Sequence, residues 1–239
     1  MSDIYRAEPS GSPRGAIILI QEIWGLVDHI RDIADRFAAQ GYLVLAPDLL
    51  STAGITPEVG QRLADARTSD DPEVRNAEQP ILREAFTAAF SPEFATDAVA
   101  TLKTVVDQLE NEPGIDGRIA VVGFCFGGTY SFALAAADPR IKAAVPFYGS
   151  GDPATIGGIT CPVLAFYGDD DRGLIARLPD VVAALDAGGV TATIQRYPGA
   201  GHAFFNDTNP IAYRPADAAD AWQRTLAFLD ASLAQPAGV

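Results

Sequence analysis

The sequence has few of the residues that hold small proteins together through covalent or metal bonds. Of its 239 residues two are cysteine and two are histidine, which is too few for a disulfide framework or a structural zinc site. No stretch approaches the ~20 apolar residues that a membrane span requires. The first residues show no basic segment followed by an apolar one, so we expect no signal peptide. We therefore expect a protein of the reducing cytoplasm, without a membrane partner.

Positive charge is also scarce. The chain has 17 Lys and Arg against 31 Asp and Glu, a formal net charge of −14. Proteins that bind the phosphate backbone present a basic face, so this balance excludes nucleic acid as an expected partner. The expected partner is a small molecule, and we expect a monomer or a weak homodimer. An anionic substrate would need a local arginine, and Arg83 and Arg172 are candidates.

What the chain does contain is typical of a globular α/β protein. Apolar residues make up 48% and charged residues 20%, and short apolar runs alternate with segments of helical spacing. This alternation predicts one α/β domain over residues 1–239, with a mostly parallel central sheet and helices on both faces. We predict strands at 16–20, 42–46, 118–122, 145–148, 163–167 and 191–196. Residues 51–92 include a polar, turn-rich stretch, and we expect them to pass over the sheet edge or the pocket.

One stretch combines a strand end with a very tight turn. The apolar run 119–122 leads into Gly123, Cys125 and Gly127, and a helix is predicted to begin near Phe126. Glycines on both sides allow the backbone to bend sharply and the strand and helix to approach closely. With serine in the middle this pattern would be the nucleophile elbow of α/β-hydrolases, so we interpret Cys125 as a nucleophile.

A thiol at this place has distinct chemistry. A free thiol titrates near ~8.5 and attacks as its thiolate. The unpaired N–H groups at a helix start favour an anion at Cys125 and an oxyanion on an attacked carbonyl. A lone cysteine after an apolar strand is usually a small buried hydrophobe, but the flanking glycines favour the nucleophile.

Two later segments supply titratable groups after predicted strands. One carries Asp169, Asp170 and Asp171, and the other carries His202. Together with Cys125 they give the chain order nucleophile, acid, histidine that α/β-hydrolases use. Taken singly, the aspartates could be a solvated turn and His202 a loop residue. We take Asp171 as the acid, with Asp170 as the alternative.

The remaining candidates lie near the first strong strand. His29 follows an aspartate at a helix start, and we expect it to be solvated and outside the mechanism. Glu22 is enclosed by Ile20, Ile23 and Trp24, and a carboxylate among apolar side chains needs a partner. A surface glutamate is the competing interpretation. The backbone N–H of Ile23 could provide an oxyanion donor.

These motifs together resemble the dienelactone hydrolase family of α/β-hydrolases. The resemblance covers about residues 15–232 and rests on five segments: Gln21-Glu22-Ile23-Trp24-Gly25, Ala46-Pro47-Asp48-Leu49, Gly123 to Gly128, Gly168-Asp169-Asp170-Asp171 and Gly201-His202-Ala203-Phe204. It implies a cofactor-free hydrolase of esters or lactones, without a metal.

The resemblance also implies a role for individual residues. It implies a triad of Cys125, His202 and Asp171, and an oxyanion hole made by the N–H groups of Ile23 and Phe126. In the mechanism proposed for the family, the glutamate at position 22 takes the thiol proton as substrate binds.

The substrate side of the resemblance is incomplete. The family grips a substrate carboxylate with two arginines, and Asn206 stands at one of these positions. Arg83 is the candidate for the other. We expect Trp24, Tyr148 and Phe204, together with the Phe126 ring, to line an aromatic pocket, although each could be ordinary core.

An alternative function uses the same thiol without hydrolysis. In this alternative the fold is a binding or redox-sensing module, and Cys125 captures a ligand or is reversibly oxidised. A sensor does not need an acid to orient a base, so His202 and Asp171 favour the hydrolase. Hydrolysis of thioesters or peptides is a third possibility.

Overall fold

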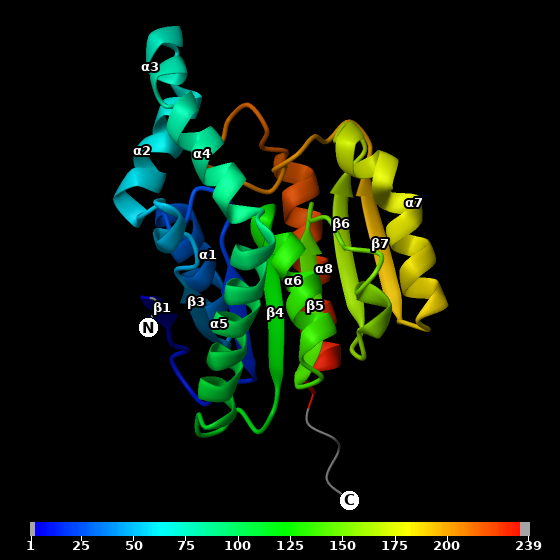
Figure 1. Cartoon of the computed structure of the whole chain (residues 1–239). Helices are drawn as coiled ribbons and strands as arrows, with labels where there is room; N and C mark the ends of the chain where they lie inside the picture. Colours follow the sequence, from blue (N-terminus) through cyan, green and yellow to red (C-terminus); the bar gives the residue numbers. More distant parts are fainter. Residues whose placement is uncertain (1–2, 235–239) are drawn as a thin grey trace, which may run out of the picture.

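A seven-stranded sheet forms the centre of the computed structural model, which describes residues 3–234 (Figure 1). The strands are β1 (Ile4–Ala7), β2 (Ala16–Ile20), β3 (Leu43–Pro47), β4 (Ile119–Phe124), β5 (Ile141–Phe147), β6 (Val163–Gly168) and β7 (Ala192–Tyr197). Their order is β1-β3-β2-β4-β5-β6-β7, and β1 alone runs antiparallel to its neighbour. The expectation of a mostly parallel sheet is confirmed.

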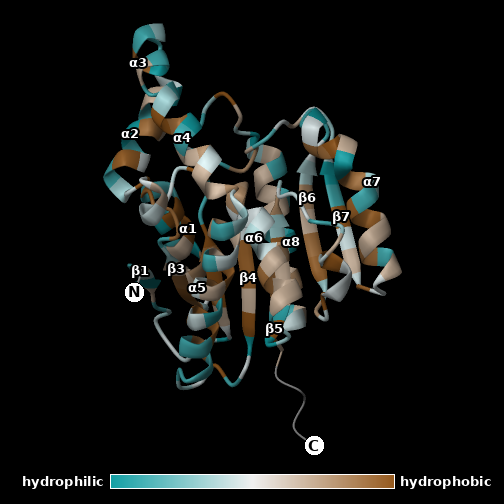
Figure 2. Cartoon of the chain, in the orientation of Figure 1, coloured by the Kyte–Doolittle hydropathy of each residue, from teal (hydrophilic) through white to brown (hydrophobic). Residues whose placement is uncertain are grey.

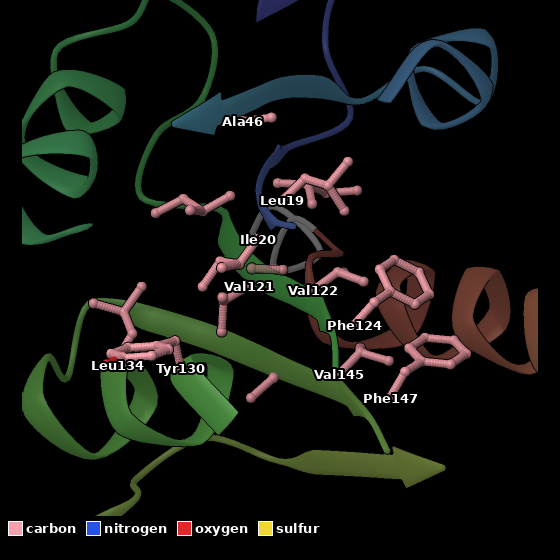
Figure 3. Close-up of a cluster of buried hydrophobic side chains, with 14 of the residues drawn as sticks. Leu19, Ile20, Ala46, Val121, Val122, Phe124, Tyr130, Leu134, Val145 and Phe147 are labelled. Atoms are coloured by element: carbon pink, nitrogen blue, oxygen red, sulfur yellow. The ribbon is translucent and has the colours of Figure 1, made fainter. Parts of the chain in front are cut away.

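The apolar runs of the sequence form the inner strands, because a parallel sheet covered on both faces must be apolar on both sides. Every residue of β2, β3, β4 and β6 is buried, and Figure 2 shows the central strands largely brown. Side chains of β4 and β5 pack together in the core, where the Phe124 and Phe147 ring centroids are 4.5 Å apart (Figure 3). The register pairs Ile20 with Gly123, so β2 and β4 end side by side.

Helices cover both faces of the sheet. They are α1 (Asp28–Ala39), α2 (Pro57–Thr68), α3 (Pro72–Ala77), α4 (Gln79–Ala89), α5 (Pro92–Glu110), α6 (Phe126–Ala137), α7 (Arg172–Ala187) and α8 (Pro215–Ser232), with 3₁₀ turns η1 (Ser51–Ala53) and η2 (Ile156–Gly158). Helices α5, α6 and α7 lie on one face, and α1 and α8 on the other (Figure 1). Phe37 of α1 and Trp222 of α8 pack with ring centroids 4.5 Å apart.

Residues 51–92 are more regular than the sequence suggested. They form η1 and the helices α2, α3 and α4, which rise above the carboxyl ends of the strands (Figure 1); we call α2, α3 and α4 the roof. Thr56 caps α2 and Asp71 caps α3 through their side-chain oxygens, and a proline follows each cap, as is common at helix starts. No helix among residues 3–234 has the length and apolarity to cross a membrane.

Helix α2 lies directly on the loop that follows β2. A Cβ atom added to Gly60 of α2 would lie 1.7 Å from the carbonyl oxygen of Trp24. Only glycine permits this approach, because such a distance is far inside van der Waals contact. The roof is therefore seated on the residue that follows Ile23.

Candidate active site

The elbow between β4 and α6 holds Cys125 in a strained backbone conformation. Its φ is 57° and its ψ is −112°, a region that non-glycine residues rarely occupy and that costs about 1–3 kcal/mol. The Cys125 N–H donates to the carbonyl of Phe147 at 3.0 Å, and its carbonyl accepts from the N–H of Thr129 at 3.1 Å. The half-buried thiol is thereby presented at the start of α6.

Close packing around the elbow explains its two glycines. A Cβ on Gly123 would lie 2.2 Å from the Gly127 carbonyl oxygen, and a Cβ on Gly127 would lie 2.1 Å from the Ile20 carbonyl oxygen. The Gly127 N–H donates to the carbonyl of Gln21 at 3.0 Å. The first turn of α6 is therefore fixed against the end of β2.

The structure brings the predicted histidine and acid together. His202 lies in the loop after β7, and its Nδ1 is 2.5 Å from Oδ2 of Asp171. Asp171 is also the N-cap of α7, where its Oδ1 lies 3.5 Å from the N–H of Leu174. Because the helix start and the histidine both hold this carboxylate, its direction is fixed.

The neighbouring aspartates have other surroundings. Asp169 forms an ion pair with Arg196 of β7 at 2.6 Å. Asp170 is exposed, and its backbone N–H donates to the carbonyl of Ala200. Of the two acids considered from the sequence, the structure therefore places Asp171 rather than Asp170 against the histidine.

His202 lies between an acid and a thiol. Burial by itself lowers the pKa of His202, but hydrogen bonds to Asp171 and Cys125 raise it to about 10. Charged neighbours that accept hydrogen bonds favour the protonated imidazole. About 39% of its side-chain surface remains exposed, and both His202 and Cys125 line the cavity described below.

Glu22 is a buried carboxylate beside this group. It is 2% exposed and accepts a hydrogen bond from Nδ2 of Asn206 at 2.7 Å and a longer one from the Tyr148 hydroxyl at 3.4 Å. Burial and the nearby charges of Glu22 and Cys125 raise the pKa of Tyr148 well above its usual value, which keeps the phenol protonated as a donor. The hydrogen-bond partners that we expected for a buried Glu22 are thus Asn206 and Tyr148.

The loop after β2 and the start of α6 each carry a backbone amide without a hydrogen-bond acceptor among residues 3–234. The Gln21 side chain, with its amide oriented to satisfy both groups, donates to the Pro47 carbonyl at 2.8 Å and accepts from the Leu49 N–H at 2.9 Å, which anchors the loop after β2. Within residues 3–234 the N–H groups of Ile23 and Phe126 donate to no other protein group. Phe126 begins α6, where amides have no helical acceptor.

A cavity of about 270 Å³ lies between the roof and the strand ends. From below it is lined by Glu22, Ile23, Trp24, Cys125, His202 and Ala203, and from the roof by Leu63, Ala66, Arg67, Arg75, Glu78, Gln79, Leu82 and Phe86. The Arg67 guanidinium lies 5.3 Å from the centroid of the Trp24 ring, a cation–π distance. The cavity therefore has an apolar wall, two arginines, two glutamates and the thiol.

Not every predicted substrate residue reaches this cavity. Arg83 is exposed on α4, and Arg67 and Arg75 are the arginines that line the cavity instead. Phe204 is fully buried and packs on Tyr148 with ring centroids 5.6 Å apart. Tyr148 is buried too and acts on the site through its hydroxyl, whereas Trp24 lines the cavity as predicted.

Two further residues differ from or extend the sequence analysis. The expectation of a solvated His29 is wrong, because this ring is 4% exposed and its Nδ1 lies 3.3 Å from Oδ1 of Asp207. The second thiol, Cys161, is buried, and burial raises its pKa to about 11. Within residues 3–234 no three His, Cys, Asp or Glu side chains are grouped so that they could hold a metal ion.

Comparisons with known proteins show the family to which the chain belongs. The dienelactone hydrolase family model matches residues 3–233. A protein of Escherichia coli K12, provisionally named carboxymethylenebutenolidase, is 34% identical over 236 residues, which cover 93% of this chain and 79% of that protein. A protein of Saccharolobus solfataricus with the same provisional name is 33% identical over 241 residues, with 91% and 90% covered. The crystal structure of a provisionally named dienelactone hydrolase from Klebsiella pneumoniae superposes with a TM-score of 0.77 at 32% identity, covering 95% of this chain and 91% of that one.

Proposed function

The chain belongs to the dienelactone hydrolase family, and from this premise we propose that it cleaves a small ester or lactone through an acyl-enzyme on Cys125. The observation that carries the proposal is the meeting of three side chains from distant segments. The strained elbow presents Cys125, His202 lines the same cavity as that thiol, and Asp171 lies 2.5 Å from Nδ1 of the ring. This is the geometry that nucleophilic catalysis needs.

In the acylation half of the reaction, the Cys125 sulfur attacks the substrate carbonyl as a thiolate. A carbon–sulfur bond forms, and the carbonyl electrons move to oxygen. The amides of Ile23 and Phe126 then donate to this oxyanion. When the tetrahedral intermediate collapses, the carbon–oxygen bond to the alcohol breaks, and the protonated ring of His202 gives its proton to the leaving oxygen.

In the deacylation half, neutral His202 takes a proton from water as the water oxygen attacks the thioester. The carbon–sulfur bond breaks, the acid product leaves, and Cys125 returns as a thiolate. Asp171 fixes the ring through Nδ1, which leaves Nε2 free for both proton transfers. Glu22 has its role before this cycle, as the acceptor of the thiol proton.

The cavity suits a small substrate. Its volume of about 270 Å³ lies near the lower end of ligand sites, which span ~300–1,000 Å³. Arg67 and Arg75 in the roof provide positive charge for an anionic group of the substrate. We also propose that the protein acts in the cytoplasm as a monomer or a weak homodimer, which size-exclusion chromatography would test.

The first prediction concerns the nucleophile. Cys125→Ala should lower the turnover of a p-nitrophenyl ester by about a thousandfold or more, because the proposed acyl-enzyme forms on this sulfur. Steady-state assays on esters with and without a carboxylate would measure this loss.

Cys161→Ala is the matched control, because that thiol is buried outside the cavity, and it should keep turnover within about twofold. Undiminished hydrolysis by Cys125→Ala would overturn the proposed function. If Cys125 reacts with alkylating reagents but the wild-type protein hydrolyses no ester or lactone in a broad panel, ligand capture or reversible oxidation becomes the better account.

A further inference from the structure

We propose that Asn206 is a positioning residue, which holds the Glu22 carboxylate in place to accept the proton of Cys125. This inference rests on the proposed function and adds a residue to it. The transfer moves one proton from the Cys125 sulfur to the carboxylate, giving a thiolate and a neutral carboxyl group. Asn206 occupies a position where the family resemblance implies an arginine.

The Asn206 amide has a fixed orientation. Its Oδ1 accepts from the N–H of Thr208 at 3.0 Å and from the Thr208 hydroxyl at 2.7 Å. An oxygen that accepts two hydrogen bonds forces the amide nitrogen to the opposite side, where Nδ2 donates to Glu22 at 2.7 Å. The side chain is 5% exposed, so water does not compete for this donor.

The segment that carries Asn206 is held from outside as well. The next residue, Asp207, pairs with Arg36 of α1 at 2.6 Å and lies 3.3 Å from the buried ring of His29. The Asn206 carbonyl accepts from the N–H of Asn209 at 3.1 Å. The segment that carries Asn206 is therefore held in place by contacts outside the site. Precise placement of the Glu22 side chain requires such support.

Both groups that donate hydrogen bonds to the Glu22 carboxylate are uncharged. Within hydrogen-bond distance it has the amide of Asn206 and the phenol of Tyr148. The other titratable or charged groups that line the same cavity are Cys125, His202, Arg67, Arg75 and Glu78. A cation in direct contact would stabilise the ionised carboxylate and weaken it as a proton acceptor. A neutral amide orients Glu22 through a hydrogen bond of 2.7 Å without placing a positive charge beside it.

An exchange of donor and acceptor tests this role. Asn206→Asp keeps the shape of the side chain but replaces the donor with a second carboxylate. Two carboxylates at hydrogen-bond distance share one proton. That proton occupies the site to which the thiol would deliver its own, so Glu22 recovers its role only at higher pH.

For Asn206→Asp we expect the alkylation rate of Cys125 by iodoacetamide at pH 7 to fall by about tenfold or more, with its rise displaced to higher pH. Mass spectrometry in a Cys161→Ala background would follow the reaction from pH 5 to 9 without any substrate. We expect kcat on a nitrophenyl ester to fall with it, and KM to change little.

The double variant Glu22→Gln with Asn206→Asp separates positioning from simple packing. It restores the hydrogen bond with donor and acceptor exchanged, so the melting temperature should return to near the wild-type value. Thiol alkylation and kcat should stay as low as in Glu22→Gln alone, because the acceptor carboxylate no longer occupies position 22.

Asn209→Asp is the matched control, since it makes the same change at another buried asparagine whose Oδ1 accepts from Ile211 at 3.3 Å. Its alkylation profile should match that of the wild type. An unchanged profile in Asn206→Asp, or recovery of kcat in the double variant, would overturn the proposal. Loss of the proposed function is a separate result, because it would appear as full activity in Cys125→Ala.

Discussion

At the scale of single residues, Asp171 carries two tasks that are usually separate. Its carboxylate begins α7 as the N-cap and also holds Nδ1 of His202 at 2.5 Å. The two tasks make different demands, because a cap needs only an acceptor oxygen, whereas orienting the imidazolium needs negative charge. A substitution that keeps the oxygen and removes the charge can therefore separate them.

Asp171→Asn should lower kcat by about a hundredfold or more, since the neutral amide no longer stabilises the protonated ring of His202. Asparagine is a good N-cap, so the free energy of unfolding should change by less than about 1 kcal/mol. Ester hydrolysis and urea unfolding would measure the two effects. Asp170→Asn is the control and should leave both near wild type. Equal kcat losses in the two variants would contradict the assignment of Asp171.

Local geometry that depends on neighbouring residues could be predicted from the sequence. The tight turn between β4 and α6 could be predicted because Gly123, Cys125 and Gly127 lie close together in the sequence, in the spacing of a nucleophile elbow. The burial of His29 could not be predicted, because this ring packs beside Asp207, which lies far along the chain. The same is true of Tyr148, whose hydroxyl meets Glu22 across 126 positions.

At the scale of elements, the roof depends on the contact of α2 with the loop after β2. Gly60→Ala would place a methyl group 1.7 Å from the Trp24 carbonyl oxygen, so α2 must move away. We expect a loss of about 1–3 kcal/mol in the free energy of unfolding, as for overpacked cores. We also expect a higher KM, because Leu63 and Arg67 of α2 line the cavity.

Gly173→Ala is the control for this substitution, because Gly173 lies in α7 with no atom within 4 Å of an added Cβ. Alanine there should leave KM unchanged and stabilise the protein by about 0.5–1 kcal/mol. Urea unfolding and ester kinetics on both variants would check the pair. An unaltered KM and stability in Gly60→Ala would show that α2 is not fixed by this approach.

Elements with a strong apolar pattern could be predicted, and those without it could not. The buried strands β2, β4 and β6 were expected from continuous apolar runs. Strand β1 was missed because only Ala7 of its four residues is buried, so an edge strand leaves little signal. Helix α2 buries only Gly60, Leu63 and Ala66, which is too narrow a stripe to stand out in a polar, proline-containing segment.

At the scale of the whole molecule, Asp207 connects the segment after β7 with α1. The His29 ring, 3.3 Å away, together with Arg36 lowers the pKa of Asp207 to about 2. A lowered pKa means that this carboxylate stabilises the folded state above its unfolded pKa of ~3.9. The stabilisation is lost as pH falls through that range toward about 2.

Asp207→Asn should therefore lower the free energy of unfolding at pH 7, with a difference from wild type that narrows as pH falls below 4. Urea unfolding between pH 7 and 3 would measure the difference. Asp32→Asn removes another acid that pairs with Arg36, but that pair is more exposed and should contribute less than about 1 kcal/mol. A difference that stays constant across this pH range would contradict the coupling.

The four side chains of the site come from positions 22, 125, 171 and 202, so they span most of the polypeptide. Contacts between such distant positions close late, because a long loop must lose its freedom before they form. During synthesis the thiol emerges with its elbow long before the imidazole that pairs with it. Under the proposed mechanism, a nascent chain therefore gains esterase activity only after the segment that follows β7 and carries His202 has been made and docked.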